Sequence, residues 1–156
     1  DEGVTEYKKE QTDLLDVIEE CKERLQESAD RKEIKIEVEG SPLVFETTKP
    51  ILEEVVYNLM DNAIKYNREQ GNVTVRIFRK EKQFGFSVKD TGIGIPLIHQ
   101  DRIFERFYRV DKSRSKEIGG TGLGLSIVKH GVSCLGAQIS VDSIPDEGST
   151  FTVTWG

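Results

Sequence analysis

The sequence predicts an α+β fold in which helices cover one face of a mixed β-sheet, forming a two-layer sandwich. Three observations predict it: helical and strand patterns are mixed along the 156 residues, the strands come in pairs, and no internal repeat occurs. The length suits a single domain with a hydrophobic core. A hydrophobic fraction of 36% and a charged fraction of 32% are typical of a soluble globular protein, and no apolar run approaches the ~18–20 residues of a membrane helix.

The N-terminal part is expected to contain a linker, a helix and two strands. Residues 1–12 are polar and aperiodic, which suggests a linker or the tail of a preceding dimerisation helix and leaves 13–156 as the domain. Asp13 is suited to cap a helix. The apolar residues at helical spacing behind it are Leu14, Ile18, Cys21 and Leu25. Alternation over 34–38 predicts a half-buried strand, and 43–45 a short one.

A second helix and a hairpin should follow. The helix begins near Thr48, with Pro50 in its first turn, and Gly71 is expected to close it. Its apolar face comprises Leu52, Val56, Leu59 and Ala63. Two alternating segments, 73–79 and 84–90, are joined by four polar residues and therefore predict a β-hairpin.

The C-terminal part predicts one helix and two strands behind a less regular region. A short helix is expected over 97–104, and 105–121 is charged with little periodicity. A third helix should span 122–135, and strands should span 137–143 and 150–155. The expected core contacts of the third helix are Leu125, Val128 and Val132.

Charge and cysteine usage restrict the class of function. Cys21 and Cys134 lie far apart at no metal-ligand spacing, so buried free thiols in a reducing cytoplasm are expected. The net charge of -6 and the lack of a basic face speak against nucleic acid. Residues 101–118 nevertheless hold six bases against four acids, an excess that suggests a polyanionic ligand.

The second helix carries a polar stripe beside its apolar face. Asn58, Asn62 and Lys65 follow one another at +4 and +3, so they share one side of the helix. A solvent-facing stripe is one interpretation. The other is a cation site, because an amide oxygen with nearby phosphates suits Mg²⁺, which takes few protein ligands, and a lysine can neutralise the phosphates.

Two glycine-rich loops supply further candidates. Asp90 ends an apolar strand and begins the stretch 90–96, where Gly92 and Gly94 allow a flat ligand to approach the backbone. A fixed carboxylate there could accept from an exocyclic amine such as that of adenine, although Asp-x-Gly could also be an ordinary turn. The stretch 119–126 opens a helix and favours phosphate. It lacks the Gly-Lys-Ser/Thr of a P-loop and the preceding strand of a dinucleotide fold.

These motifs together resemble the catalytic domain of bacterial sensor histidine kinases, within the GHKL ATPase superfamily. The similar segments, in the family's order, are its asparagine box (58–66), first glycine box (90–96), phenylalanine box (103–111), second glycine box (120–124) and closing-strand motif (148–151). The resemblance covers about residues 13–156 and implies the Bergerat ATP-binding fold with a mobile ATP lid over 105–121. Related gyrases, chaperones and mismatch-repair ATPases carry a catalytic glutamate where this chain has Asn58.

The resemblance implies a role for each matching residue. Asn62 would ligate Mg²⁺ with support from Asn58, Lys65 would contact phosphate, and Asp90 would accept from the adenine amine of ATP. Arg109, or Arg106 as second choice, would reach the γ-phosphate. The other residues expected around the nucleotide are Tyr66, Gly92, Gly94, Ile95, Gly120, Thr121, Gly122, Leu123, Gly124 and Ser149. Phe104 and Phe107 would dock the lid or face the partner domain.

The implied activity is transfer of the γ-phosphoryl group of ATP to a histidine on a separate dimerisation domain, with slow hydrolysis. His99 and His130 lack the acceptor signature. The alternatives are a nucleotide-binding module without transfer activity and a serine-phosphorylating kinase of the anti-sigma-factor type. The implied partners are the parent's own dimerisation domain and a response regulator. The fragment is expected to be monomeric and the parent a homodimeric, membrane-anchored sensor with this domain in the cytoplasm, similar to phosphate-sensing kinases.

Overall fold

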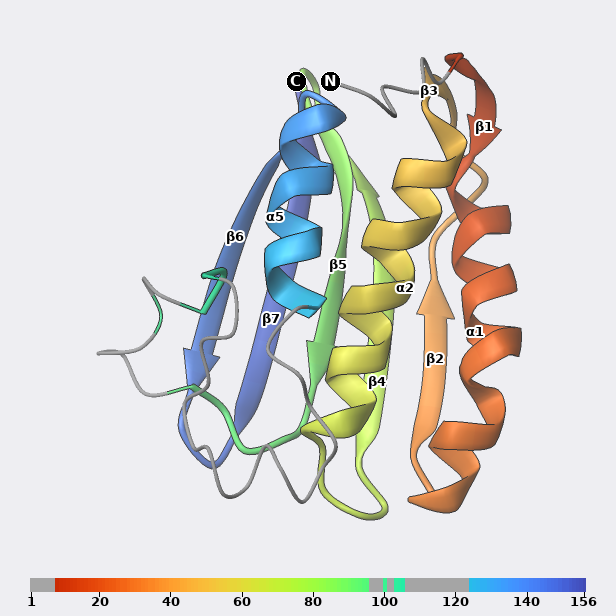
Figure 1. Ribbon diagram of the computed structural model, residues 1–156. Coiled ribbons are helices and arrows are strands. Elements are labelled where there is room, and N and C mark those ends of the chain that lie inside the picture. Colours follow the sequence, from red (N-terminus) through yellow and green to blue (C-terminus); the bar gives the residue numbers. More distant parts are fainter. Residues whose placement is uncertain (1–7, 96–99, 101–102, 106–123) are drawn as a thin grey trace, which may run out of the picture.

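The computed structural model describes residues 8–95, 100, 103–105 and 124–156, and the structural statements below concern these residues (Figure 1). The elements, in chain order, are β1 (Glu10–Asp13), α1 (Leu14–Arg31), β2 (Lys35–Glu39), β3 (Val44–Thr47), α2 (Lys49–Lys65), β4 (Asn72–Arg79), β5 (Phe84–Asp90), α5 (Gly124–Cys134), β6 (Gln138–Ile144) and β7 (Gly148–Trp155). None of the described helices is both long enough and apolar enough to cross a membrane.

Five strands form a mixed sheet, and the helices α1, α2 and α5 lie side by side on one of its faces (Figure 1). The strand order is β2-β4-β5-β7-β6, with β2 parallel to β4 and all other neighbours antiparallel. A separate two-stranded ribbon pairs β1 with β3. The predicted two-layer α+β sandwich is confirmed.

The hydrophobic core lies between the helices and the sheet. The apolar stripes predicted for the first two helices are buried, and Phe86 of β5 is the largest fully buried side chain facing them. Burial of a side chain of this size contributes about 1.5–3 kcal/mol. The strands alternate as predicted, because every second residue of β7, from Ser149 to Trp155, is buried.

The start of α1 confirms the predicted cap and adds a strand before it. The Asp13 carboxylate accepts from Leu15 N and from Leu43 N, each at 3.0 Å. It therefore caps the helix and also holds the chain that leads into β3. Glu10–Asp13 pairs with Val44–Thr47, so the last residues of the expected linker form a strand of the fold. The sequence did not predict this strand, because its four polar residues lack the apolar alternation that indicates a strand.

The helix α2 ends earlier than predicted. It begins behind Thr48 with Pro50 in its first turn, as expected, but it ends at Lys65 with Tyr66 as C-cap rather than at Gly71. The Asn67 carboxamide explains the difference, because its Oδ1 accepts from Arg68 N at 2.8 Å. An asparagine that bonds its own backbone offers the chain an alternative to the next helical turn.

The C-terminal elements follow the prediction closely. In α5, Val128 and Val132 are buried and Leu125 packs against the core. Cys21 is buried as expected, but the expectation for Cys134 is wrong, because this residue is exposed in the last turn of α5. Most of the short helix expected over 97–104 lies outside the described residues.

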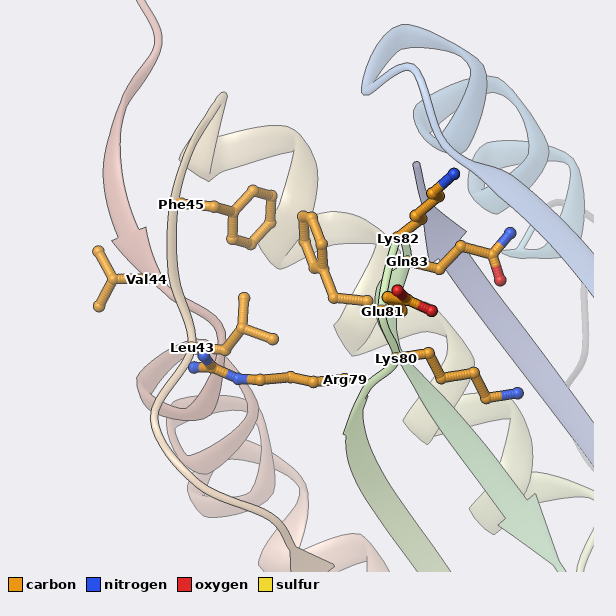
Figure 2. Close-up of a pocket in the computed structure, with 9 residues that line it drawn as sticks. Leu43, Val44, Phe45, Arg79, Lys80, Glu81, Lys82 and Gln83 are labelled. Carbon is orange, nitrogen blue, oxygen red and sulfur yellow. The ribbon is translucent and has the colours of Figure 1, made fainter.

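A groove of about 380 Å³ lies at the end of the sheet opposite Asp90, beside the β4–β5 turn (Figure 2). Its described lining is Leu43, Val44, Phe45, Arg79, Lys80, Glu81, Lys82, Gln83 and Phe84. Beneath it Phe84 stacks on Trp155 with ring centroids 5.5 Å apart, and Phe45 meets both rings edge-on at 5.0 Å. No predicted site residue lies in this lining, so the groove belongs to the packing of the sheet's far end.

Candidate functional site

The candidate site is centred on Asp90, the last residue of β5. The sheet register places Asp90 opposite Ser149 of β7, and Ser149 opposite Ser143 of β6. Asp90 is only 6% exposed. Its Oδ1 accepts from Gly92 N at 2.8 Å and from Ser149 N at 3.3 Å. Two backbone N–H groups therefore fix the carboxylate at the edge of the sheet.

Burial raises the pKa of Asp90 from 3.8 to about 6, and the hydrogen bonds from Gly92 and Ser149 lower it in part. No described residue donates to the second oxygen, Oδ2. In the described part of the chain, no side-chain oxygen is both buried and without a hydrogen-bond partner. Oδ2 therefore reaches the surface, where it is open to a donor on a ligand.

The loop after Asp90 requires glycine at two positions. A Cβ at Gly92 would overlap the carbonyl oxygen of Tyr66, and Gly94 has φ +73° with no room for a Cβ beside the Ile144 carbonyl. Between them, Ile93 N donates to Tyr66 O at 3.2 Å. The loop thus lies directly against the end of α2, which brings the first glycine motif and the asparagine motif together.

Serine hydroxyls connect the far side of this loop to the sheet. Ile95 N donates to Ser143 Oγ at 2.7 Å, and Ser143 Oγ lies 2.7 Å from Ser149 Oγ. Ser143 was not among the predicted site residues, because its contribution depends on the pairing of β6 with β7. Ser149 contacts Asp90 directly through its backbone N–H; its expected place beside the nucleotide remains a prediction.

The polar stripe of α2 faces the beginning of α5. Asn58, Asn62 and Lys65 are all half-buried on α2, as their spacing predicted. The Asn58 Nδ2 donates to Glu54 O at 2.7 Å, and a Cβ built on Gly124, the first residue of α5, would lie 3.7 Å from Asn58 Oδ1. The amide oxygen of Asn58 therefore points toward the helix start where phosphate was predicted. The stripe is not the solvent-facing surface of an isolated helix.

Lys65 and Asn62 differ in their present partners. Lys65 Nζ forms an ion pair with Asp61 Oδ2 at 3.0 Å and keeps 41% of its side chain exposed. No described residue hydrogen-bonds to the carboxamide of Asn62. Both residues are only half-buried, so part of each remains exposed.

The donor set fits Mg²⁺ held together with phosphates. Among the described residues, no group of three or more His, Cys, Asp or Glu side chains could hold a metal ion. A divalent cation here would depend on amide oxygens, ligand oxygens and water, which is the coordination that Mg²⁺ tolerates and Zn²⁺ does not favour.

Several predicted residues cannot be placed. Outside the described residues lie Arg106, Phe107, Arg109, Gly120, Thr121, Gly122 and Leu123. Phe104 is described, and its ring meets Phe151 edge-on with centroids 6.2 Å apart, while Lys129 Nζ lies 5.9 Å from the Phe104 ring. Phe104 therefore packs on the core, and the lid-docking or partner-facing role expected for it remains a prediction.

A polar network that the sequence did not predict ties α2 to the Asp90 loop. Asn67 is 6% exposed, its Nδ2 donates to Asn72 O at 2.9 Å, and Thr91 Oγ1 donates to Asn67 Oδ1 at 3.1 Å. Arg68 also donates to the Asp146 carbonyl in the β6–β7 turn. The one feature of the sequence that could have pointed to Asn67 is its position directly after Tyr66, the last residue of the asparagine motif.

Comparison with known proteins decides the family. The family model described as histidine kinase-, DNA gyrase B-, and HSP90-like ATPase matches residues 47–156, most of the chain. The chain belongs to this ATPase family. The sensor protein PhoR of the Pseudomonas aeruginosa phosphate regulon is 42% identical over 119 residues, covering 76% of this chain and 27% of that protein. The sensor-like histidine kinase SenX3 of Mycolicibacterium smegmatis is 37% identical over 144 residues, covering 91% and 37%.

Solved structures agree with these sequence relatives. The mycobacterial sensor histidine kinase MprB superposes with a TM-score of 0.81 at 30% identity, covering 94% of this chain and 95% of that one. Full-length ShkA in complex with AMPPNP gives a TM-score of 0.83 at 27% identity, covering 97% and 32%. The chain spans 27% and 37% of the two curated relatives, so it corresponds to the ATPase domain within longer sensor histidine kinases.

Proposed function

We propose that this ATPase domain binds Mg²⁺-ATP and transfers its γ-phosphoryl group to a histidine on a separate dimerisation domain. The observation that carries the proposal is the meeting of three features at one edge of the sheet. These features are the fixed Asp90 carboxylate, the Asn58–Asn62–Lys65 stripe of α2 and the beginning of α5. A base-recognising acceptor thus lies on the same surface as groups suited to phosphate.

We expect Asp90 to recognise adenine. Its Oδ1 is occupied by Gly92 N and Ser149 N, which leaves Oδ2 to accept a hydrogen bond from the adenine amine. A fixed acceptor discriminates against bases that present a carbonyl oxygen at that position, because two acceptors would then face each other without a proton. Gly92 and Gly94 let the loop pack against the carbonyl groups of Tyr66 and Ile144, which holds the loop in place next to Asp90.

We expect α2 and the start of α5 to bind the phosphates. Asn62, supported by Asn58, would hold a magnesium ion whose charge neutralises the phosphate oxygens. Lys65 is exposed enough to reach a phosphate while it stays beside Asp61. The amide groups at the beginning of α5 add partial positive charge, and Gly124 brings them near Asn58. Arg109 and Arg106 remain our candidates for the γ-phosphate.

The transfer needs positioning and neutralisation of charge more than covalent chemistry from this domain. An imidazole nitrogen of the acceptor attacks the γ-phosphorus, the new N–P bond forms, and the bond to the β–γ bridging oxygen breaks. ADP leaves with that electron pair, and the imidazole releases its proton to solvent. Asn58 stands where the related ATPases have a glutamate, so no carboxylate is available there to activate water, and hydrolysis should be slow.

The decisive experiment mixes this domain with its parent's dimerisation domain and radiolabelled ATP. We expect label that is stable to base and labile to acid, as phosphohistidine is, and its loss in the Asp90→Ala variant. ATP binding without transfer would favour a nucleotide-binding module, and acid-stable phosphoserine would favour a serine kinase of the anti-sigma-factor type. Failure to bind ATP at all would overturn the proposal.

We further propose that the parent protein is a homodimeric, membrane-anchored sensor whose ATPase domain faces the cytoplasm and whose phosphohistidine supplies a response regulator. The isolated domain should be a monomer. Light scattering on this domain and phosphotransfer from the labelled parent to purified receiver domains would test the two parts separately.

A further inference from the structure

Lys32 holds the end of α2 through both its side chain and its backbone. It follows directly on α1 as the C-cap residue. Its Nζ donates to three carbonyl oxygens, those of Ile64 at 3.0 Å, Lys65 at 3.0 Å and Asn67 at 2.9 Å. Its own carbonyl oxygen accepts from Gln70 N at 2.8 Å. Four backbone groups of the segment 64–70 therefore hydrogen-bond to this one lysine.

The chemistry of a lysine ammonium fits this place. The last carbonyl groups of a helix have no partner within the helix, and they form the negative end of its dipole. An ammonium group is a compact charge with three donors that can serve three converging oxygens. The flat fork of an arginine cannot match this geometry. The contact thus supplies both charge and hydrogen bonds where α2 ends.

The segment that Lys32 holds connects the two halves of the candidate site. On one side Lys65 belongs to the polar stripe of α2. On the other side the Tyr66 carbonyl accepts from Ile93 N at 3.2 Å, and the Asn67 carboxamide accepts from Thr91 Oγ1 at 3.1 Å. These contacts set the position of the Asp90 loop relative to α2.

We propose that Lys32 is a positioning residue for Mg²⁺-ATP. It acts through the end of α2, fixing the distance between the phosphate-facing stripe and the adenine-facing Asp90, and it does not touch the nucleotide. This inference rests on the proposed nucleotide binding at the same site. It assigns a function to the contact between α1 and α2, in a part of the chain that precedes the matched family region.

The test measures nucleotide affinity and stability separately. Calorimetric titration of Mg²⁺-ATP, at a temperature where every variant is fully folded, should give a Kd for Lys32→Met raised about tenfold, equivalent to about 1.4 kcal/mol. Lys32→Gln, which keeps a donor, should show a smaller rise in the same direction. Lys35→Met is the matched control, because Lys35 is an exposed lysine on β2 paired with Glu37; its Kd should equal that of the wild type.

Chemical rescue separates positioning from general damage. In a Cys134→Ser background, Lys32→Cys can be converted with bromoethylamine to a lysine analogue of nearly the same length. Cys21 is spared because it is buried and its pKa is raised to about 11. Aminoethylation should restore the wild-type Kd.

Two results would overturn the role of Lys32: an unchanged Kd in Lys32→Met with only a lower melting temperature, or no recovery of affinity after aminoethylation. A wild-type domain that fails to bind Mg²⁺-ATP would give a different pattern, and that result would count against the proposed function itself.

Discussion

Replacing Asp90 by asparagine should stabilise the domain while abolishing its preference for ATP. Asparagine has the same shape as aspartate, and its Oδ1 can still accept from Gly92 N and Ser149 N. What changes is the charge, together with the atom at the Oδ2 position, which becomes a donor. Stability and ligand choice should therefore respond in opposite ways to one substitution.

The magnitude follows from the raised pKa of Asp90. Because the folded-state pKa lies above the ordinary value, the stabilising effect of the proton is fully present below pH 3.8 and is lost as the pH rises through about 6. A rise from 3.8 to about 6 corresponds to about 3 kcal/mol at neutral pH. This net rise already includes the hydrogen bonds from Gly92 and Ser149, which favour the charged form. We therefore expect Asp90→Asn to be up to about 3 kcal/mol more stable at pH 7.

The stability assay is urea denaturation of wild type and Asp90→Asn at pH 7 and at pH 4. The gain of the variant should be present at pH 7 and nearly absent at pH 4, where the wild-type carboxyl is protonated in the folded state. A variant that is less stable than the wild type at pH 7 would show that the buried charge of Asp90 is not costly.

The binding assay compares ATP with inosine triphosphate, which carries a carbonyl oxygen in place of the amine. The wild type should prefer ATP, and Asp90→Asn should lose ATP affinity and gain affinity for the inosine nucleotide. In the wild type, ATP binding should weaken as the pH falls below about 6, because a protonated Oδ2 no longer accepts. The ionisation of the ATP phosphates also changes ATP affinity with pH. The same titration on Asp90→Asn measures that contribution, so it can be subtracted from the wild-type result. Unchanged ATP affinity in Asp90→Asn would refute the assignment.

Three further outcomes are expected. Asn62→Ala should weaken ATP binding strongly with Mg²⁺ and weakly in EDTA, by calorimetry; equal losses would contradict a role in metal binding. Gly92→Ala should lower both the melting temperature and ATP affinity, because its Cβ would overlap the Tyr66 carbonyl oxygen; normal values for both would show that the loop can move aside. With Ellman's reagent, Cys134 should react at once and buried Cys21 only on unfolding, so two fast thiols would contradict the packing of α1.

Periodicity was sufficient to predict the long helices and the hairpin, and residue chemistry singled out the residues that we propose for the site. Apolar residues recur at helical spacing in α1 and α2 because one side of each helix is buried. This pattern lies within a single segment, so the sequence of that segment is enough to reveal it. Gly92 and Gly94 were singled out for the close approach of a flat ligand, whereas the structure shows a different need for glycine: Gly94 has φ +73°, and a Cβ at either position would overlap a backbone carbonyl.

What could not be predicted depends on contacts between distant segments. The pairing of β1 with β3 joins the polar residues of β1 to a segment 31–37 positions further along the chain. Lys32 and its three carbonyl partners are separated by 32–35 residues, and nothing in the spacing of a single lysine indicates such a contact. The contact between Thr91 Oγ1 and the Asn67 carboxamide likewise joins residues 24 positions apart.

The register of the sheet explains why the site forms where it does. Phe86, Phe151 and Val153 face the helices and are buried, and a slip by one residue would turn such side chains to the opposite face. That same register places Asp90 opposite Ser149, at the rung where the apolar side chains of β5 end. The hydrophobic core therefore aligns the polar groups of the site, and β7 gives Asp90 its second N–H donor only because the core holds the strand in that position.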